Sequence, residues 1–185
     1  MAIEKWKTLA SDYLIKRPWL TARRDKVELP NGKVYDEYYV LEYPDWVNVI
    51  ALDREGNMIL ERQWRHAAGI VSTEICAGVI EKGETPLQAA QRELLEETGY
   101  AGGNWAHFMT IMPNPSTMTN TCHCFIATNV ERISNQHLDE TEDIEVLFVP
   151  RSEVYTMLQE GQFHQAMMAA PLWKFFADTN QPSQK

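Results

Sequence analysis

Runs of apolar and aromatic residues, separated by polar turn residues, divide the chain into predicted strands and helices. Three strands are predicted near the N-terminus, over residues 6–15, 19–29 and 33–43. The Asn-Gly pair between the second and the third tolerates the positive φ angles of a tight hairpin turn. Strands this aromatic are not stable as a free hairpin, so we expect them to pack on the rest of the chain or on a second subunit.

The middle of the chain predicts a second hairpin, over residues 46–53 and 57–62. Ser152 is a candidate cap for a helix that reaches Gly161, and a last helix is predicted over residues 163–177. Five apolar residues would pack that last helix: Met167, Met168, Leu172, Phe175 and Phe176. The remaining predicted strands are residues 105–112, 121–128 and 144–149.

The stretch GVIEKGETPLQAAQRELLEETGY, at residues 78–100, carries the strongest helix signals in the chain. Thr85 is a good N-cap, Gln88 completes a capping box with it, and Pro86 takes the first helical position. A glycine near the end of the stretch suits the left-handed conformation that terminates a helix. These signals predict a helix over residues 86–98, preceded by a loop.

Three carboxylates of this predicted helix, those of Glu93, Glu96 and Glu97, lie at i, i+3 and i+4 and therefore share one helix face. They repel one another, and they occupy the half of the helix in which the dipole disfavours anions. Such a cluster is tolerable if it holds hard divalent cations, of which Mg²⁺ is the default. The alternative is a solvated acidic face.

The charged residues and glycines of the stretch also follow a fixed spacing: Gly78, five residues, Glu84, seven residues, Arg92-Glu93-Leu94, one residue, Glu96-Glu97, one residue, Gly99. This pattern resembles the Nudix box, with Tyr100 at a position where an aliphatic residue is commoner. Nudix enzymes hydrolyse a nucleoside diphosphate linked to another group. The resemblance covers nearly the whole chain and implies an α+β protein with the Nudix fold. That fold is an α/β/α sandwich with a mixed β-sheet, here preceded by an N-terminal antiparallel β-extension.

The resemblance further implies a site that uses Mg²⁺, with Mn²⁺ as an alternative ion. Arg92 is expected to orient the carboxylates, and Glu140 is favoured over Glu142 as the base or an extra ligand in the polar segment 135–143. An acidic surface loop is the alternative for that segment. The implied metal ligands are the Ala77 carbonyl and the carboxylates of Glu93, Glu97, Glu96 and Glu140. The implied catalytic residues are Glu96, Glu97, Glu140, Glu142 and Arg92.

Two segments before the helix extend the resemblance. Residues 62–65, Arg-Gln-Trp-Arg, resemble a segment of ADP-sugar pyrophosphatases and favour Arg65 as a bidentate phosphate clamp, with an ordinary surface arginine as the alternative. Residues 74–78 resemble an ELPAG segment in which Cys76 replaces proline, and this places Glu74 near the substrate. The implied substrate-binding residues are Arg65, Glu74, Trp19, Gly78 and Pro115.

Pro115 follows the box by fifteen residues and resembles the proline that marks the ADP-ribose pyrophosphatase branch. Trp19 resembles an adenine-stacking aromatic of those relatives, although simple packing is the alternative. The loop reads Pro-Asn-Pro-Ser where relatives often have Pro-Ser-Pro-Gly, so the substrate stays open between ADP-ribose and, for example, GDP-mannose. A dinucleoside polyphosphate hydrolase would have a tyrosine a few residues after this proline. This chain has Thr117, Met118 and Thr119 there, which argues against that branch.

Charge and cysteine content limit the molecules that the protein can bind and indicate its compartment. The formal net charge of −9 on 185 residues repels nucleic-acid backbones unless cations intervene. No apolar run reaches membrane-spanning length, and an odd number of cysteines, three, with no CxxC motif indicates reduced thiols in a cytoplasmic protein. Cys122 and Cys124 alternate with His123, as in a strand, so a zinc site made by these three residues is disfavoured.

We therefore expect a hydrolase that cleaves ADP-ribose, or a related nucleoside diphosphate sugar, to a nucleoside monophosphate and a sugar phosphate. Residues 1–43 would form a dimerisation extension that contributes to the substrate site, residues 44–178 the Nudix domain, and residues 179–185 a flexible tail. A homodimer through the N-terminal strands is the expected assembly. A sugar-nucleotide-binding regulator without catalysis is the alternative from another class, and the intact box argues against it.

Overall fold

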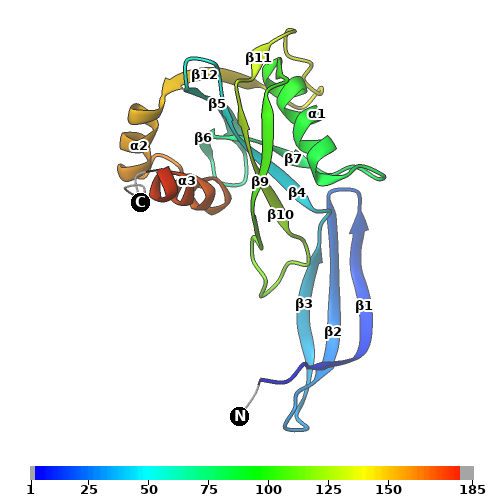
Figure 1. Cartoon of the computed structure of the whole chain (residues 1–185). Helices are drawn as coiled ribbons and strands as arrows, with labels where there is room; N and C mark the ends of the chain where they lie inside the picture. The colour runs from blue at the N-terminus through cyan, green and yellow to red at the C-terminus, as the bar shows by residue number, and fades with distance from the viewer. Residues whose placement is uncertain (1–2, 180–185) are drawn as a thin grey trace. The chain divides into compact units, whose positions relative to one another are not determined.

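The computed structural model describes residues 3–179, which form two compact units (Figure 1). The predicted tail therefore lies outside the described residues except for Thr179. Within the described range, no helix is both long and apolar enough to cross a membrane.

The first unit is built on three antiparallel strands in the order β1-β2-β3. They are β1 (Lys7–Arg17), β2 (Leu20–Glu28) and β3 (Val34–Glu42), which confirms the three predicted N-terminal strands to within a few residues. A hairpin turn at Gly32, whose φ is +80°, joins β2 to β3 and explains why glycine is needed there.

A distant segment completes this unit. Residues 112–121 belong with the three strands rather than with the elements on either side of them in sequence. The Leu41 N–H donates to the Thr117 carbonyl at 2.7 Å, and the Thr119 N–H donates to the Leu41 carbonyl at 3.1 Å. The Tyr38 hydroxyl adds a bond of 2.7 Å to the Ser116 carbonyl. The segment therefore lies along β3 as an irregular edge.

The second unit, residues 45–111 and 122 onward, contains a seven-stranded mixed sheet between helices. The path through the sheet is β12-β5-β4-β10-β9, with β6 paired to β5 and β7 paired to β4; β4 and β10 are parallel. Helix α1 covers one face, and α2 and α3 cover the other (Figure 1). The elements are β4 (Trp46–Leu52), β5 (Asn57–Arg65), β6 (Ile70–Glu74), β7 (Cys76–Val79), α1 (Pro86–Thr98), β8 (Tyr100–Ala101), β9 (Asn104–Ile111), β10 (Cys122–Thr128), β11 (Glu131–Arg132), β12 (Ile144–Pro150), α2 (Arg151–Gln159) and α3 (Ala166–Thr179).

Side-chain alternation along the central strands produces two cores. Ile50 of β4 and Leu60 of β5 are fully buried against α2 and α3. Val49 of β4 and Ile59 of β5 point the opposite way and are fully buried with Leu94 of α1. The α/β/α sandwich with a mixed sheet and an N-terminal antiparallel extension is thus confirmed.

Three local features differ from the sequence expectations. The short strands β6, β7, β8 and β11 were not predicted: β6 forms a hairpin with β5, β7 pairs with the more distant β4, and β11 pairs with β8. Helix α2 begins at Arg151 after Pro150 and has no side-chain cap, so the predicted capping role of Ser152 is wrong. Helix α3 begins at Ala166 rather than at residue 163, and it accommodates Pro171 in its interior.

Candidate active site

Helix α1 has the predicted bounds and the predicted caps. The Thr85 hydroxyl accepts the Gln88 N–H at 3.3 Å, while the Thr85 N–H donates to the Gln88 side-chain oxygen at 2.9 Å. Gly99 ends the helix in the left-handed conformation, with φ of 77°. The capping box and the glycine stop therefore fix where the acidic residues of the last turns project.

The three carboxylates of α1 lie in different surroundings. Glu97 is buried, with 4% relative exposure, and its Oε2 accepts the Ala77 N–H at 3.3 Å. The side chain of Glu93 is 12% exposed and that of Glu96 is 43% exposed. A solvated acidic face would leave all three in water, so that alternative is wrong for Glu93 and Glu97.

Arg92 lies at the centre of an ion-pair network. Its Nε and Nη2 donate to the two carboxylate oxygens of Glu84, at 2.8 and 3.0 Å. Its Nη1 lies 2.9 Å from Glu93 Oε1 and 3.0 Å from Glu96 Oε2, and Nη2 also donates to the Val79 carbonyl at 2.9 Å. This network occupies all the N–H donors of the guanidinium group, and it fixes the loop before α1 to the acidic face of the helix.

Gly78 explains how Glu93 reaches its position. A Cβ atom at residue 78 would lie 2.0 Å from the Glu93 Cδ and 2.1 Å from its Oε1. The φ of Gly78 is outside the left-handed region, so close approach rather than backbone conformation requires the glycine. The Glu93 carboxylate therefore packs directly on the backbone of β7.

These carboxylates also interact electrostatically. Burial raises the pKa of Glu97 to about 8, with further raising by the charges of Glu93 and Glu142 and an opposing effect of the Cys76 thiol. Burial raises the pKa of Glu93 as well; the Arg92 charge lowers it, and the charges of Glu96 and Glu142 add to the increase. The carboxylates lie close together and are partly removed from water, so their negative charges repel one another. A bound divalent cation would stabilise them.

The polar segment 135–143 docks on the end of α1. The Gln136 amide donates to the Glu97 carbonyl at 2.7 Å, and the His137 N–H donates to the Glu96 carbonyl at 2.8 Å. Within this segment, Glu142 is half-buried and its charge acts on both Glu93 and Glu97, whereas Glu140 is exposed. The structure thus brings Glu142, rather than the favoured Glu140, to the carboxylate cluster.

Arg65 and Glu74 form a bidentate pair beside the cluster. The Arg65 Nε and Nη2 donate to the two Glu74 oxygens at 2.9 and 2.5 Å. Glu74 is buried, while the Arg65 side chain stays 42% exposed. Arg65, Ala77 and Gly78 line the same cavity of about 330 Å³, together with residues of β4 and α3. The cavity therefore meets the carboxylate site at β7.

Glu61 is a buried acid that the sequence reading missed. It has 0% relative exposure on β5, and a Glu61 oxygen, the Cys76 sulfur and a Glu97 oxygen lie within 4.8 Å of one another. Alternation was the available signal, because Glu61 follows Ile59 by two residues and so shares its inward face.

The other predicted site residues lie in different places. Trp19 is 78% exposed in the turn between β1 and β2, and Pro115 lines a cavity of about 530 Å³ within the first unit. Cys122 and Cys124 are buried in an apolar cluster with Met167, while His123 is only half-buried, as alternation predicted.

Comparison with known proteins gives two family matches and several relatives. Residues 6–41 match the nucleoside diphosphate sugar hydrolase N-terminal domain, and residues 42–170 match the NUDIX domain. The chain is 30% identical over 164 residues to an ADP-ribose pyrophosphatase of Bacillus subtilis, covering 88% of each protein. It is 32% identical over 133 residues to a GDP-mannose pyrophosphatase of Pectobacterium atrosepticum, covering 66% of this chain and 68% of that protein. A crystal structure of an ADP compounds hydrolase has the same fold, with a TM-score of 0.84 at 19% identity, over 98% of this chain and 100% of that one.

Proposed function

The chain belongs to the Nudix family, and on that premise we propose that it hydrolyses the diphosphate bridge of a nucleoside diphosphate sugar, with ADP-ribose as the first candidate substrate. Water would add across the bridge to release a nucleoside monophosphate and a sugar phosphate. The observation that supports this most strongly is the placement of Glu93 and Glu97 against β7, a strand whose Ala77 and Gly78 line a cavity together with Arg65.

The donor atoms at this place fit a hard divalent cation. Glu93, Glu97 and Glu142 act on one another through their charges, and all three offer carboxylate oxygens. We propose that Glu93, Glu97 and the Ala77 carbonyl hold Mg²⁺, with Glu96 assisting. When bound, the cation supplies the positive charge that neutralises a diphosphate and lowers the pKa of water.

The chain's own residues would orient and protect the reacting groups. Arg92 holds Glu93 and Glu96 in fixed positions rather than meeting the substrate, because all its donors are already used within the protein. Arg65, which Glu74 orients, would direct its exposed edge toward a phosphate in the cavity. Glu142 is the preferred residue for removing a proton from water, and Glu140 is the second choice.

The substrate class follows from both parts of the chain. The N-terminal match is to a domain of nucleoside diphosphate sugar hydrolases, and one relative is an ADP-ribose pyrophosphatase. The GDP-mannose pyrophosphatase relative makes GDP-mannose the second candidate. Trp19 and Pro115 remain proposed contributors to recognition of the base and sugar.

A side-by-side assay tests the function. With Mg²⁺ and separate ADP-ribose, GDP-mannose and dinucleoside polyphosphate substrates, we expect turnover of a sugar nucleotide and products resolved by ion-exchange chromatography as a nucleoside monophosphate and a sugar phosphate. Chelation by EDTA should abolish turnover. Binding of sugar nucleotides with no cleavage in Mg²⁺ or Mn²⁺ would contradict the proposal and favour the non-catalytic regulator.

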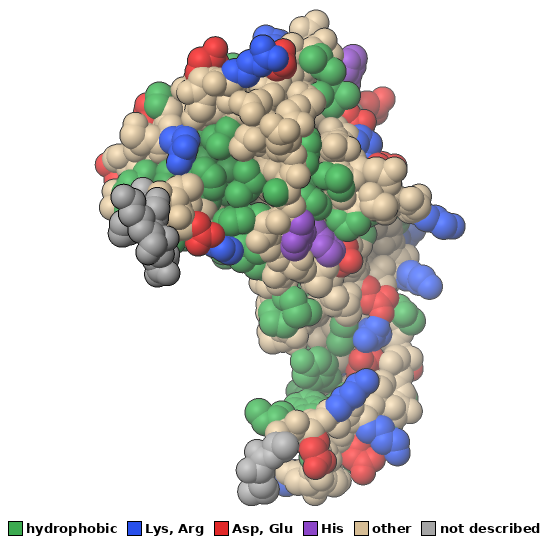
Figure 2. Space-filling view, viewed as in Figure 1, with side chains coloured by type: hydrophobic (Ala, Val, Ile, Leu, Met, Phe, Trp, Pro, Cys, Tyr) green, Lys and Arg blue, Asp and Glu red, His purple; other side chains and the backbone are tan. Residues whose placement is uncertain are grey.

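We further propose that residues 1–43 form a dimerisation extension to a catalytic domain at residues 44–178. All eleven residues of β1 are exposed, and Figure 2 shows apolar side chains among the charged ones of this unit. Exposed apolar groups of this extent favour a protein interface. The free thiols of the three cysteines support the cytoplasm as the compartment. The exposed apolar residues of the three strands are Leu9, Tyr13, Leu14, Ile15, Leu20, Val34, Tyr35 and Tyr39.

A charge placed on this surface should separate the subunits. We expect Leu14→Lys, which alters a 52% exposed leucine of β1, to shift a wild-type dimer to monomer in analytical ultracentrifugation. Thr8→Lys adds the same charge at another exposed position of β1 and serves as the matched control. A wild-type protein that stays monomeric at micromolar concentration would contradict the proposed assembly.

A further inference from the structure

Glu61 is a buried acid that no basic side chain among residues 3–179 hydrogen-bonds, and its acidic neighbours are Glu97 and Glu74. It is fully buried on β5, and neither of its carboxylate oxygens has a hydrogen-bond partner among residues 3–179. Arg65 is a cation whose charge reaches it, but the Arg65 guanidinium already donates two hydrogen bonds to Glu74. A carboxylate left unpaired in the core is unfavourable, so Glu61 must either stay protonated or meet a positive ion.

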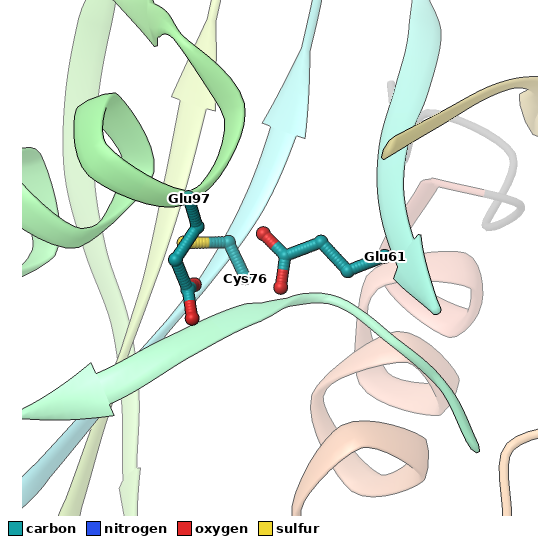
Figure 3. Close-up of side chains that lie close together, drawn as sticks. All are labelled: Glu61, Cys76 and Glu97. Carbon is teal, nitrogen blue, oxygen red and sulfur yellow. The ribbon is translucent and has the colours of Figure 1, made fainter. Parts of the chain in front are cut away.

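The side chains nearest to Glu61 come from two other elements. Figure 3 shows the Glu61 carboxylate directed toward the sulfur of Cys76, from β7, and the carboxylate of Glu97, from α1. The three residues lie on the face of the sheet that α1 covers, because Cys76 packs in the same core as Ile59. Their potential ligand atoms lie within 4.8 Å of one another, and all three residues are buried.

These atoms form a recognisable donor set for a metal. A zinc ion bonds a thiolate sulfur at about 2.3 Å and a carboxylate oxygen at about 2.0–2.2 Å, so small side-chain rotations would bring all three donors into reach of one ion. A thiolate favours transition metals over Mg²⁺ and Ca²⁺, which select oxygen donors. The set of two carboxylate oxygens and one sulfur therefore prefers a different class of metal ion from the Mg²⁺ site proposed above, whose donors are all oxygens.

We propose that Glu61, Cys76 and Glu97 form a second, buried cation site that takes a divalent transition-metal ion such as Zn²⁺ or Co²⁺. The unpartnered Glu61 carboxylate points to an occupant, and the Cys76 sulfur points to its chemical class. The two sites share Glu97, so an ion bound here would constrain the orientation of that carboxylate.

Charge balance at this site requires proton release. Burial raises the pKa of the Cys76 thiol and of the Glu61 carboxyl, so the metal-free protein holds both groups protonated. A divalent ion that binds here displaces to solvent the protons of Glu61 and Cys76 and, at a pH below about 8, that of Glu97, and three anionic ligands then face one dication.

A cobalt titration tests the proposal without reference to turnover. Reduced, metal-free protein is titrated with Co²⁺, and we expect a thiolate-to-cobalt charge-transfer band in the near ultraviolet that saturates at about one ion per chain. Cys76→Ala should abolish the band. Cys122→Ala, which removes another buried cysteine away from the carboxylates, should retain it. Glu61→Gln should weaken cobalt binding at this band by about 10-fold or more.

Two results would overturn the buried site: no charge-transfer band in wild-type protein, or a band that persists in Cys76→Ala. Glu61→Leu provides a second variant, because an apolar residue of similar size suits this core position and should keep the protein folded. It should show the wild-type melting temperature or a higher one in the metal-free state and no tight cobalt band. The Mg²⁺ assay on wild-type protein separates the two proposals, since turnover without a cobalt band would remove only the second site.

Discussion

Replacing Glu97 by glutamine should lower kcat by more than about 100-fold, because even residues that merely support metal ligands cost 10- to 100-fold when they are changed. Glu97 of α1 is buried and contacts the backbone of Ala77. Of the three helix carboxylates it is therefore the one whose place a water molecule can least easily take. The glutamine oxygen can still accept the Ala77 N–H. Steady-state kinetics in saturating Mg²⁺ would measure the loss.

The same substitution should not destabilise the fold. Burial and the charges of Glu93 and Glu142 oppose ionisation of Glu97, and a neutral amide removes that repulsion. The melting temperature of metal-free Glu97→Gln should therefore match or exceed that of the wild type. Glu145→Gln, an exposed change on β12, provides the control and should leave both quantities near wild type. Turnover within a few-fold of wild type in Glu97→Gln would eliminate the proposed metal-dependent mechanism.

The second large effect is expected from adding one methyl group at Gly78. The new Cβ of Gly78→Ala would collide with the end of the Glu93 side chain, which is flexible and can move at little cost in stability. The carboxylate would then leave its place by about 1 Å or more, and a displacement of that size can cost about 100-fold in rate. We therefore expect kcat to fall by about 10- to 100-fold with little change in the melting temperature.

Another glycine provides a control with the opposite pattern. Gly56, in the turn between β4 and β5, has a φ of +82° and open space where a side chain would go. Gly56→Ala should lower the melting temperature through backbone strain while leaving kcat unchanged. In a double-mutant cycle, Gly78→Ala should add little loss to Glu93→Ala, because both changes remove the same carboxylate from the site. Independent, additive losses would show that Gly78 acts otherwise.

Helix α1 could be predicted to the residue because its signals are local. Thr85, Pro86, Gln88 and Gly99 each act on their own turn of backbone, and the family spacing adds to them. The same holds for the hairpins, whose turns are encoded by neighbouring residues. The fold class and the acidic face of this helix followed from such short-range patterns.

The parts that could not be predicted depend on contacts between distant segments. Glu61 becomes a buried acid only because β5 lies inside the sheet, between β12 and β4, with α1 on its face. The preference for Glu142 over Glu140 depends on how Gln136 anchors the segment to α1. Alternation with Ile59 places Glu61 on an inward face, but it does not show that α1 closes that face, and no sequence pattern separates Glu142 from Glu140.

The docking of residues 112–121 along β3 affects how the chain folds during synthesis and how it can be truncated. The ribosome delivers β1, β2 and β3 first, yet their last backbone partner emerges only after the whole of α1 and β9 has been synthesised. The N-terminal unit therefore cannot finish folding as an autonomous early domain. A truncated chain that begins after Pro44 would likewise leave the Pro115 loop without the strand that holds it, so removing the extension alters more than the proposed dimer surface.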